Sequence, residues 1–585
     1  MTSSDAEFPQ LLSAAQDWAA QDPDPATSAA LSELILHSQE GVLSARQELT
    51  DSFSGTLQFG TAGLRAPLGP GPSRMNRVVV RRAAAGLAAF LTSAVDGASP
   101  GTRPRAVVGY DARHNSDIFA EETAAIFTAA GIETFLMPQA LPTPLLAYAV
   151  KSLDCDGGVM VTASHNPPQD NGYKVYLGRH AVGENGRGAQ IVAPYDAKIA
   201  AAIERVGPLE EITLAPEGWT VLGPSMAAEY EAATAALALP QHFPARDLKI
   251  VLTPMHGVGG DTAVRVLNAA GFADVTLVAE QAQPDPDFPT VSFPNPEEPG
   301  ALDLALETAA RVDADIVLAN DPDADRAAVA AKDPDTGAWR MLRGDEVGSL
   351  LGAHVVARLA AAAAAGDGTS PQGGVFANSI VSSRLLARIA AAAGYAHEET
   401  LTGFKWISRV PGLLYGYEEA LGYCVAPELV RDKDGISAAV LIAEFAAAAK
   451  AGQKTIFDTL DELYLVHGLH ASDQLSIRVA DLGLLDAMMN RLRVSAPDSF
   501  GGSAVETFRD LAEGTEQLPP TDGLLYLTKD RTRVIIRPSG TEPKLKCYLE
   551  VIRSVGSAAE LPEARQGARA ALDAVLTDVR EALGL

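Results

Sequence analysis

The chain has 585 residues, 47% hydrophobic and 21% charged, and this length and composition indicate a soluble globular protein with several hydrophobic cores. Its 74 acidic and 46 basic residues give a formal net charge of −28 at pH 7, which disfavours nucleic acid and anionic membranes as partners. The three cysteines, Cys155, Cys424 and Cys547, lie far apart, which excludes a disulfide framework or a zinc knuckle.

The first residues contain neither the basic segment nor the apolar segment of an export signal. No uninterrupted apolar run along the chain reaches membrane-spanning length. We therefore expect a cytoplasmic protein without a membrane anchor.

Short β-branched runs alternate with alanine-rich helical stretches, and this alternation predicts an α/β fold. The expected strands include residues 106–109, 134–137, 158–161, 249–252, 275–278 and 316–318. Three stretches that open near Arg105, Leu248 and Gly374 look like loose copies of one unit. We therefore expect three related α/β domains.

The last segment has a different pattern, with strands expected at 475–479, 533–537 and 545–552 and helices at 482–492 and at the C-terminus. This pattern predicts a smaller α+β domain. The expected domains are residues 1–220, 221–338, 339–467 and 468–585. Candidate linkers are 207–224, 333–337 and 467–473, and 333–337 reads as a hairpin turn.

Two glycine-containing segments each carry one cation, Arg65 within 59–66 and Lys405 within 401–406. Neither segment has the Gly-Lys-Ser/Thr ending of a nucleotide-binding P-loop. As isolated patterns, both are most often structural turns.

Ser164 lies in the loop 162–174, directly after the strand expected at 158–161. Open α/β sheets bind ligands at such strand ends, and the Asn-Pro-Pro and Asn-Gly dipeptides favour a turn that holds the serine outward. A serine placed there can accept a phosphoryl group, with His165 beside it to assist. The alternative is an ordinary surface loop, whereas a serine hydrolase is disfavoured because no G-x-S-x-G elbow surrounds any serine.

Asp321, Asp323 and Asp325 alternate along the loop that follows the strand expected at 316–318. Three carboxylates on one side of an extended loop, without histidine or cysteine, suit Mg²⁺. An EF-hand loop is excluded, because its sixth and twelfth positions would be glycine and glutamate and are Arg326 and Lys332 here.

Glu418 and Glu419 are adjacent carboxylates among glycines and the tyrosines Tyr415, Tyr417 and Tyr423. The carboxylates suit hydrogen bonding to sugar hydroxyls, and the tyrosines could pack on a sugar ring. Alone, such a glutamate pair is usually a solvated surface feature.

Arg537 opens the tight loop 537–544, which presents a guanidinium, two hydroxyls and backbone amides. A loop of this kind can bind a phosphate group. A β-turn without a ligand is the equally good alternative when the segment is judged alone.

Together and in this order, these segments resemble the α-D-phosphohexomutase superfamily from residue 59 to about residue 544. The opening 59–65 with 69–71 is similar to its phosphoglucomutase/phosphopentomutase branch. The resemblance implies four domains around a central cleft: three related α/β mixed-sheet domains and a smaller C-terminal α+β domain. It also implies Mg²⁺ and a sugar bisphosphate, such as glucose 1,6-bisphosphate, as activator and intermediate.

By the same resemblance, Ser164 would be the phosphoserine and would bind Mg²⁺ together with Asp321, Asp323 and Asp325. The other catalytic residues would be His165, Lys174, Arg65 and Arg326, with Lys174 as our candidate base. The substrate would be bound by Thr402, Gly403, Lys405, Glu418, Glu419, Arg537, Ser539, Gly540 and Thr541.

The implied activity is that of a phosphosugar mutase, an intramolecular phosphotransferase, with α-D-glucose 1-phosphate and glucose 6-phosphate as the leading pair. A phosphopentomutase for ribose or deoxyribose phosphates, a phosphomannomutase and a glucose-1,6-bisphosphate synthase stay open as alternatives. Mannose is less expected, because Ala420 and Tyr423 stand where many relatives have serine and the phosphomannomutase type has histidine. A non-enzymatic phosphosugar binder is disfavoured, since the serine and all three aspartates are present. We expect a monomer or a homodimer.

Overall fold

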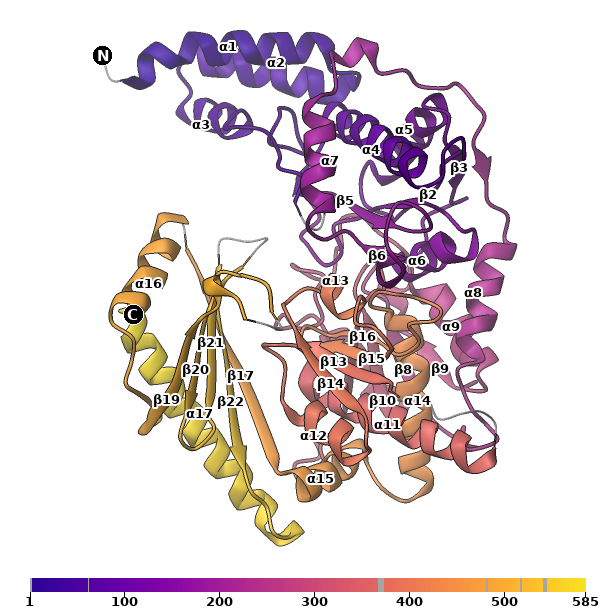
Figure 1. Ribbon diagram of the computed structural model, residues 1–585, viewed down its shortest axis with the longest axis vertical. Coiled ribbons are helices and arrows are strands. Elements are labelled where there is room, and N and C mark those ends of the chain that lie inside the picture. The colour runs from indigo at the N-terminus through magenta and orange to yellow at the C-terminus, as the bar shows by residue number, and fades with distance from the viewer. Residues whose placement is uncertain (1–2, 61–62, 367–372, 480–481, 516–517, 540–543) are drawn as a thin grey trace. The chain divides into compact units, whose positions relative to one another are not determined.

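The computed structural model describes residues 3–60, 63–366, 373–479, 482–515, 518–539 and 544–585 (Figure 1). The chain forms two compact units. The first unit comprises Met1–Leu239, Arg246–Ala330 and Ala426–Ala443, and the second comprises Pro240–Ala245, Ala331–Val425 and Glu444–Leu585.

The first unit opens with a layer of three helices, α1 (Ser3–Gln21), α2 (Pro25–Gln39) and α3 (Leu43–Ser52). They pack on one another through Leu31 and Leu49, which are fully buried. The layer is tied to the following domain because Arg77 donates a hydrogen bond to the carbonyl oxygen of Pro23 at 2.9 Å.

The first sheet has the strand order β1-β5-β4-β2-β3-β7, with β6 beside β5. Its strands are β1 (Leu64–Pro67), β2 (Arg105–Tyr110), β3 (Glu133–Leu136), β4 (Gly157–Val161), β5 (Asp170–Leu177), β6 (Ala189–Gln190) and β7 (Thr220–Val221). Its helices are α4 (Arg77–Ala98), α5 (Ser116–Ala129), α6 (Thr143–Ser152) and α7 (Tyr195–Glu204). Because β2 and β4 are parallel neighbours, the loops that leave their carboxyl ends emerge at the same sheet edge.

The second sheet has the order β12-β11-β10-β8-β9. Its strands are β8 (Ile250–Thr253), β9 (Val275–Leu277), β10 (Ile316–Asn320), β11 (Ala327–Lys332) and β12 (Trp339–Met341), and its helices are α8 (Ser225–Ala235), α9 (Gly260–Ala269) and α10 (Asp303–Val312). All of β10 is buried, and the aspartate loop leaves its carboxyl end. A later segment of the chain, which includes the start of α14 (Gly435–Ala451), completes the first unit.

The second unit contains the third and fourth sheets. The third is β14-β13-β15-β16, built from β13 (Val375–Ser379), β14 (Ala396–Thr400), β15 (Leu413–Glu418) and β16 (Gly422–Cys424), with α11 (Gly344–Ala365), α12 (Leu385–Ala392), α13 (Phe404–Ile407) and α15 (Ile456–His467). The fourth sheet is antiparallel and has α16 (Leu482–Val494) and α17 (Leu561–Leu583) as its helices (Figure 1). Its order is β17-β22-β21-β20-β19-β18, with β17 (Leu469–Arg478), β18 (Ser499–Phe500), β19 (Ser503–Asp510), β20 (Leu524–Thr528), β21 (Arg533–Pro538) and β22 (Lys544–Arg553).

The architecture of three α/β domains followed by a smaller α+β domain confirms the sequence-based prediction. The turn at 333–337 is also confirmed, since Asp333 donates its backbone N–H to the oxygen of Ala338 at 2.8 Å. The expected linker at 467–473 is wrong, because β17 begins at Leu469 and pairs there with Arg553 of β22. Polar residues on a half-exposed strand gave this stretch the composition of a loop.

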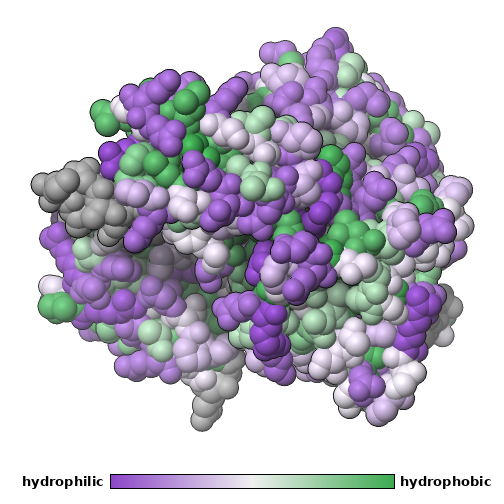
Figure 2. All heavy atoms as spheres, turned by 90° about the horizontal axis from the view of Figure 1, so that it is seen from above, coloured by the Kyte–Doolittle hydropathy of each residue, from purple (hydrophilic) through white to green (hydrophobic). Residues whose placement is uncertain are grey.

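Two described helices, α4 and α11, are long and apolar enough to cross a membrane by length and composition, and the bent pair of α14 and α15 would add a third. Charged residues interrupt both helices, Arg81 and Arg82 in α4 and Arg358 in α11, so neither is the uninterrupted apolar run that the sequence expectation concerned. In the structure, 56% of the apolar 18-residue stretch of α4 and 44% of that of α11 are buried. Both helices therefore bury much of their apolar surface inside the fold. Hydrophilic residues predominate on the face shown in Figure 2.

Candidate active site

Ser164 lies just after β4 in a left-handed backbone conformation, with φ of 52°. Its hydroxyl donates a hydrogen bond to Asp321 Oδ2 at 2.7 Å and lies 3.2 Å from His165 Nδ1. Its backbone N–H donates to the Thr162 hydroxyl at 2.8 Å. A non-glycine residue in this conformation is strained, and such strain persists only where the surroundings hold the backbone in place.

Arg113 is the group that holds this loop. Its guanidinium donates to four backbone oxygens of the loop, those of Ser164 (2.7 Å), Asn166 (2.5 Å), Pro167 (2.7 Å) and Asp170 (3.1 Å). Asp111 lies 3.4 Å from Arg113 Nε, and both side chains are 1% exposed. A planar, forked cation suits this task, because one side chain can satisfy several acceptors at fixed angles.

Asp321, Asp323 and Asp325 are fully buried and each offers a carboxylate oxygen within 4.8 Å of the others. Asp323 Oδ2 accepts hydrogen bonds from the Thr143 hydroxyl at 2.7 Å and from Lys174 Nζ at 2.6 Å. The second oxygens of Asp323 and Asp325 are buried and accept no hydrogen bond from the described residues. Buried carboxylate oxygens without donors, held this close together, fit a divalent cation with hard oxygen ligands.

The electrostatics of the triad support this fit. Burial, followed by the charges of Asp323 and Asp325, raises the pKa of Asp321 well above its ordinary range. Burial opposes charge on Lys174 as well, but Asp323 and Asp325 outweigh it and raise the pKa of the amine. Lys174 is therefore an ammonium ion that compensates the aspartates, which is a different state from the neutral amine that a base requires.

Two further cations, Arg326 and Lys433, lie against the triad, and a third, Arg65, lies against the serine loop. Arg326 Nε lies 3.8 Å from Asp321 Oδ2 and 3.7 Å from Asp325 Oδ1. Arg65, on β1, donates to the side-chain oxygen of Asn166 at 3.2 Å and so contacts the serine loop rather than the triad. Lys433 Nζ lies 3.2 Å from Asp325 Oδ2.

Sequence reasoning missed Lys433 and Arg113. Lys433 comes from the distant segment Ala426–Ala443, which is packed so closely that a Cβ on Gly435 would lie 2.2 Å from the oxygen of Arg326. The charged run Asp432-Lys433-Asp434 before a glycine was the available signal, although nothing local relates it to the aspartates.

The predicted sugar-binding residues lie in the second unit. Glu418 Oε1 accepts the backbone N–H of Gly403 at 3.2 Å, so it shapes the loop that carries Thr402 and Lys405. Glu419 Oε2 accepts the hydroxyls of Ser379 at 3.0 Å and Ser382 at 2.9 Å. Burial, reinforced by the charge of Glu418, raises the pKa of Glu419 to about 7.

The tyrosines of this segment do not form a sugar platform. Tyr415, Tyr417 and Tyr423 have no exposed surface, and they stack on one another in the core with centroids 6.3 and 6.5 Å apart. That part of the sequence-based expectation is wrong. Because Tyr423 is turned into the core, its identity also gives no argument against mannose.

Arg537 is the second-last residue of β21, and Ser539 donates its backbone N–H to the oxygen of Lys544 at 2.8 Å. Gly540 and Thr541 lie outside the described residues. Burial is the main cause that raises the pKa of Tyr548, and the charge of Glu419 adds to it while that of Arg537 opposes it. Glu419 and Arg537 therefore both lie near Tyr548.

Comparison with known proteins covers most of the chain. Models of the phosphoglucomutase/phosphomannomutase alpha/beta/alpha domains I, II and III match residues 56–207, 229–337 and 352–465, and the model of the C-terminal domain of that family matches 489–566. A Haemophilus influenzae protein named "Probable phosphomannomutase" is 45% identical over 81% of this chain and 93% of its own length. Mouse phosphopentomutase is 34% identical over 92% of this chain and 90% of its own length.

A crystal structure shows the same fold. It is that of a phosphoglucomutase/phosphomannomutase family protein from Burkholderia thailandensis, which is 21% identical and covers 88% of this chain and 96% of its own chain with a TM-score of 0.61.

Proposed function

We propose, from the premise that the chain belongs to the phosphoglucomutase/phosphomannomutase family, that Ser164 carries the phosphoryl group which it transfers to and from its substrate. As a member of this family the protein is a phosphosugar mutase, an intramolecular phosphotransferase. The observation that carries the proposal is the hydrogen bond from the Ser164 hydroxyl to Asp321 of the buried aspartate triad.

Asp321, Asp323 and Asp325, with a phosphate oxygen on Ser164, would hold Mg²⁺, which when bound neutralises charge on the transferring phosphoryl group. When the Ser164 phosphate leaves, the bond between phosphorus and Oγ breaks and a bond to a sugar hydroxyl oxygen forms. Oγ then needs a proton, and His165 Nδ1 at 3.2 Å is placed to exchange it.

Lys174 is our candidate for the base that accepts the proton of the attacking hydroxyl. Its pKa is raised by Asp323 and Asp325, so it takes that proton only when the charges of these two aspartates are neutralised. Arg326, next to the triad, would stabilise the charge that develops on the phosphoryl oxygens. A sugar bisphosphate forms, turns round and returns its other phosphate to Ser164, so the enzyme ends the cycle phosphorylated.

In the second unit, Glu418 and Glu419 would bind sugar hydroxyls, with Thr402, Gly403 and Lys405 orienting the ring. Arg537 and Ser539 would bind the phosphate that is not reacting, because a guanidinium and backbone amides suit a phosphate group. Gly540 and Thr541 are assigned to the same loop by the family resemblance.

We propose α-D-glucose 1-phosphate and glucose 6-phosphate as the substrate pair, with glucose 1,6-bisphosphate as intermediate. Phosphopentomutase activity is the second candidate, supported by the 34% identity to mouse phosphopentomutase over 92% of the chain. The name of the Haemophilus influenzae relative makes mannose phosphate a third substrate to test.

The test has two parts. Intact-mass analysis should find one phosphate on the wild-type chain and none on Ser164→Ala, which should also lose mutase turnover, whereas the exposed control Ser225→Ala should keep both. A phosphorylated or fully active Ser164→Ala chain would refute the proposal. A Mg²⁺-dependent assay of glucose, mannose, ribose and deoxyribose 1-phosphates, with and without glucose 1,6-bisphosphate, would identify the sugar and distinguish a mutase from a bisphosphate synthase.

A further inference from the structure

A cavity of about 600 Å³ lies in the second unit, away from the residues discussed so far. It is formed by α12, the end of α15, the turn between β20 and β21, and the end of β22. The described residues that line it include Arg388, His467, His470, Arg531 and Arg553, and no carboxylate is among them. A cavity whose charged lining residues are all arginines, with no acidic residue, is unexpected in a chain of net charge −28.

The three arginines of this cavity also have no partner among the residues that the structure describes. The guanidinium groups of Arg388, Arg531 and Arg553 form no hydrogen bond or ion pair with any residue that the structure describes, and all three residues are exposed. Cations that line one cavity without counter-charges favour the binding of an anion there. Burial, followed by the positive charges of His470 and Arg388, lowers the pKa of His467, which agrees with a cationic environment.

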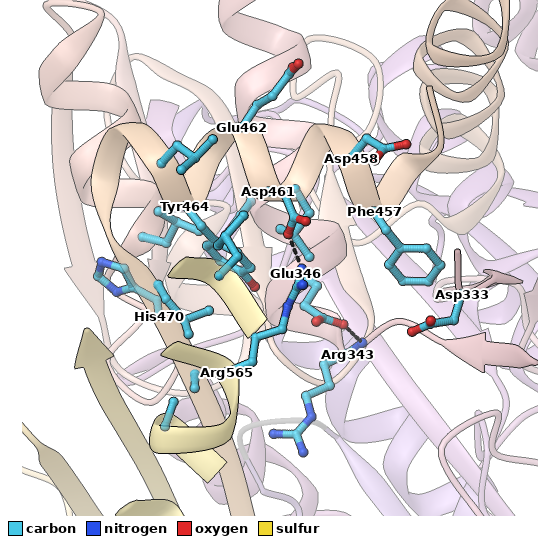
Figure 3. A pocket seen from close by; sticks show the side chains of 18 of the residues that line it. Asp333, Arg343, Glu346, Phe457, Asp458, Asp461, Glu462, Tyr464, His470 and Arg565 are labelled. Atoms are coloured by element: carbon cyan, nitrogen blue, oxygen red, sulfur yellow. Dashed lines mark hydrogen bonds and ion pairs between the residues drawn. The ribbon is translucent and has the colours of Figure 1, made fainter. Parts of the chain in front are cut away.

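In a larger neighbouring cavity of about 860 Å³, arginines are paired with carboxylates of the protein (Figure 3). There Arg565 is ion-paired with Asp461, and Arg340 contacts Glu346 at 2.9 Å. Arg569 likewise contacts Asp473 at 2.5 Å. The cations of the larger cavity are neutralised by the protein itself, so the smaller one is the better candidate for an anion.

His470 lines both this cavity and the larger one. It lines the smaller cavity with only 6% of its surface exposed, and its Nδ1 lies 3.2 Å from Glu550 Oε1. Its Nε2 is buried and has no hydrogen-bond partner among the described residues. Because a carboxylate only accepts, Nδ1 is the ring nitrogen that donates to Glu550.

This cavity is separate from the predicted phosphate loop. The loop precedes Lys544 at the start of β22, whereas the cavity is lined by Arg553 at the end of that strand. A ten-residue strand is about 30 Å long, so one phosphate group cannot contact both ends.

We propose that this cavity is a second anion site, which binds a small soluble phosphate compound through Arg388, Arg531 and Arg553. Its volume is that of a small-molecule site, and guanidinium groups are the preferred partners of phosphate. The bound anion would connect α12 to the turn before β21 and the end of β22, and so stabilise the junction between the third and fourth sheets.

Calorimetric titration of the full chain with inorganic phosphate at low ionic strength tests the proposal. The Arg537→Gln chain serves as the background, so that binding at the predicted phosphate loop is weakened throughout. Adding Arg388→Gln and Arg553→Gln should raise the phosphate Kd about tenfold for each arginine removed, because each loses a charge-assisted hydrogen bond. Phosphate should also raise the Tm of the background chain and leave that of the triple variant unchanged.

The matched control is Arg509→Gln, which removes the same charge from an exposed arginine on β19. An equal loss of affinity in this control, or unchanged phosphate binding without Arg388 and Arg553, would overturn the proposal. A parallel titration with glucose 6-phosphate distinguishes the sources. Only the binding that the triple variant loses is assigned to this cavity, because the candidate active site is also proposed to bind this sugar phosphate. If that binding is tighter than the binding of inorganic phosphate, the ligand is a phosphate ester, and if it is equal, the ligand is inorganic phosphate. Both arginines are exposed and unpaired among the described residues, so their variants are expected to fold, which circular dichroism would verify.

Discussion

The two compact units hold the carboxylates of their candidate site residues in contrasting ways. In the first unit, three aspartates with no exposed surface lie within 4.8 Å of one another and are balanced by lysine side chains. In the second unit, Glu418 and Glu419 are partly exposed and accept hydrogen bonds from an N–H group and two hydroxyls. Buried charge held rigidly suits phosphoryl transfer, whereas neutral donors around an accessible carboxylate suit recognition of hydroxyl groups.

This contrast predicts that substitutions in the first unit mainly lower kcat and that those in the second mainly raise KM. The largest effect is expected for Lys174→Ala, which should lower kcat by about 10²–10⁴-fold with little change in KM, because a proton-transfer group is lost. Steady-state kinetics would measure it. Lys198→Ala, an exposed lysine of the same domain, should behave like wild type, and unchanged turnover in Lys174→Ala would remove this residue from the mechanism.

A smaller effect is expected for Arg113→Gln. Its loss leaves Asp111 buried without its partner, which should cost about 3–5 kcal/mol of stability, and a loosened Ser164 should lower kcat about 10²-fold. Arg113→Lys should not rescue kcat, because an ammonium cannot span the four loop carbonyls. Thermal unfolding and kinetics would measure both effects, with Arg103→Gln as control, since Arg103 also donates to a backbone oxygen but at the surface. A rise in KM alone would contradict the positioning role.

The smallest effect concerns Glu419, whose pKa of about 7 lies above the ordinary 4.5. The folded chain therefore keeps a proton that the unfolded chain releases, so this contribution to stability is present below about pH 4.5 and is lost as the pH rises through 7. The fall of Tm with rising pH that this contribution causes should be absent in Glu419→Gln.

Ser382→Ala should raise KM several-fold at constant kcat, because one hydrogen bond to Glu419 is lost. A kcat effect from Ser382→Ala would contradict this division between the two units.

Local patterns account for what the sequence could predict. Ser164 and the three aspartates were found because each group occupies one short loop after a β-branched run. Arg113 was missed because it reaches Ser164 across 51 residues, and Ser382 because it reaches Glu419 across 37. The tyrosines were misassigned although Tyr415 and Tyr417 are two residues apart, the spacing that places both on one face of a strand and so toward one core.

The position of Gly435 has a consequence for synthesis of the chain. Its backbone N–H donates to the oxygen of Ala324 at 3.2 Å, and the segment around it brings Lys433 to Asp325. On the ribosome, the serine and aspartate loops emerge long before this segment, with Ala331–Val425 translated in between. A chain truncated after residue 330 would therefore lack one lysine of the aspartate cluster, and the nascent first unit reaches its final form only after much of the second has been translated.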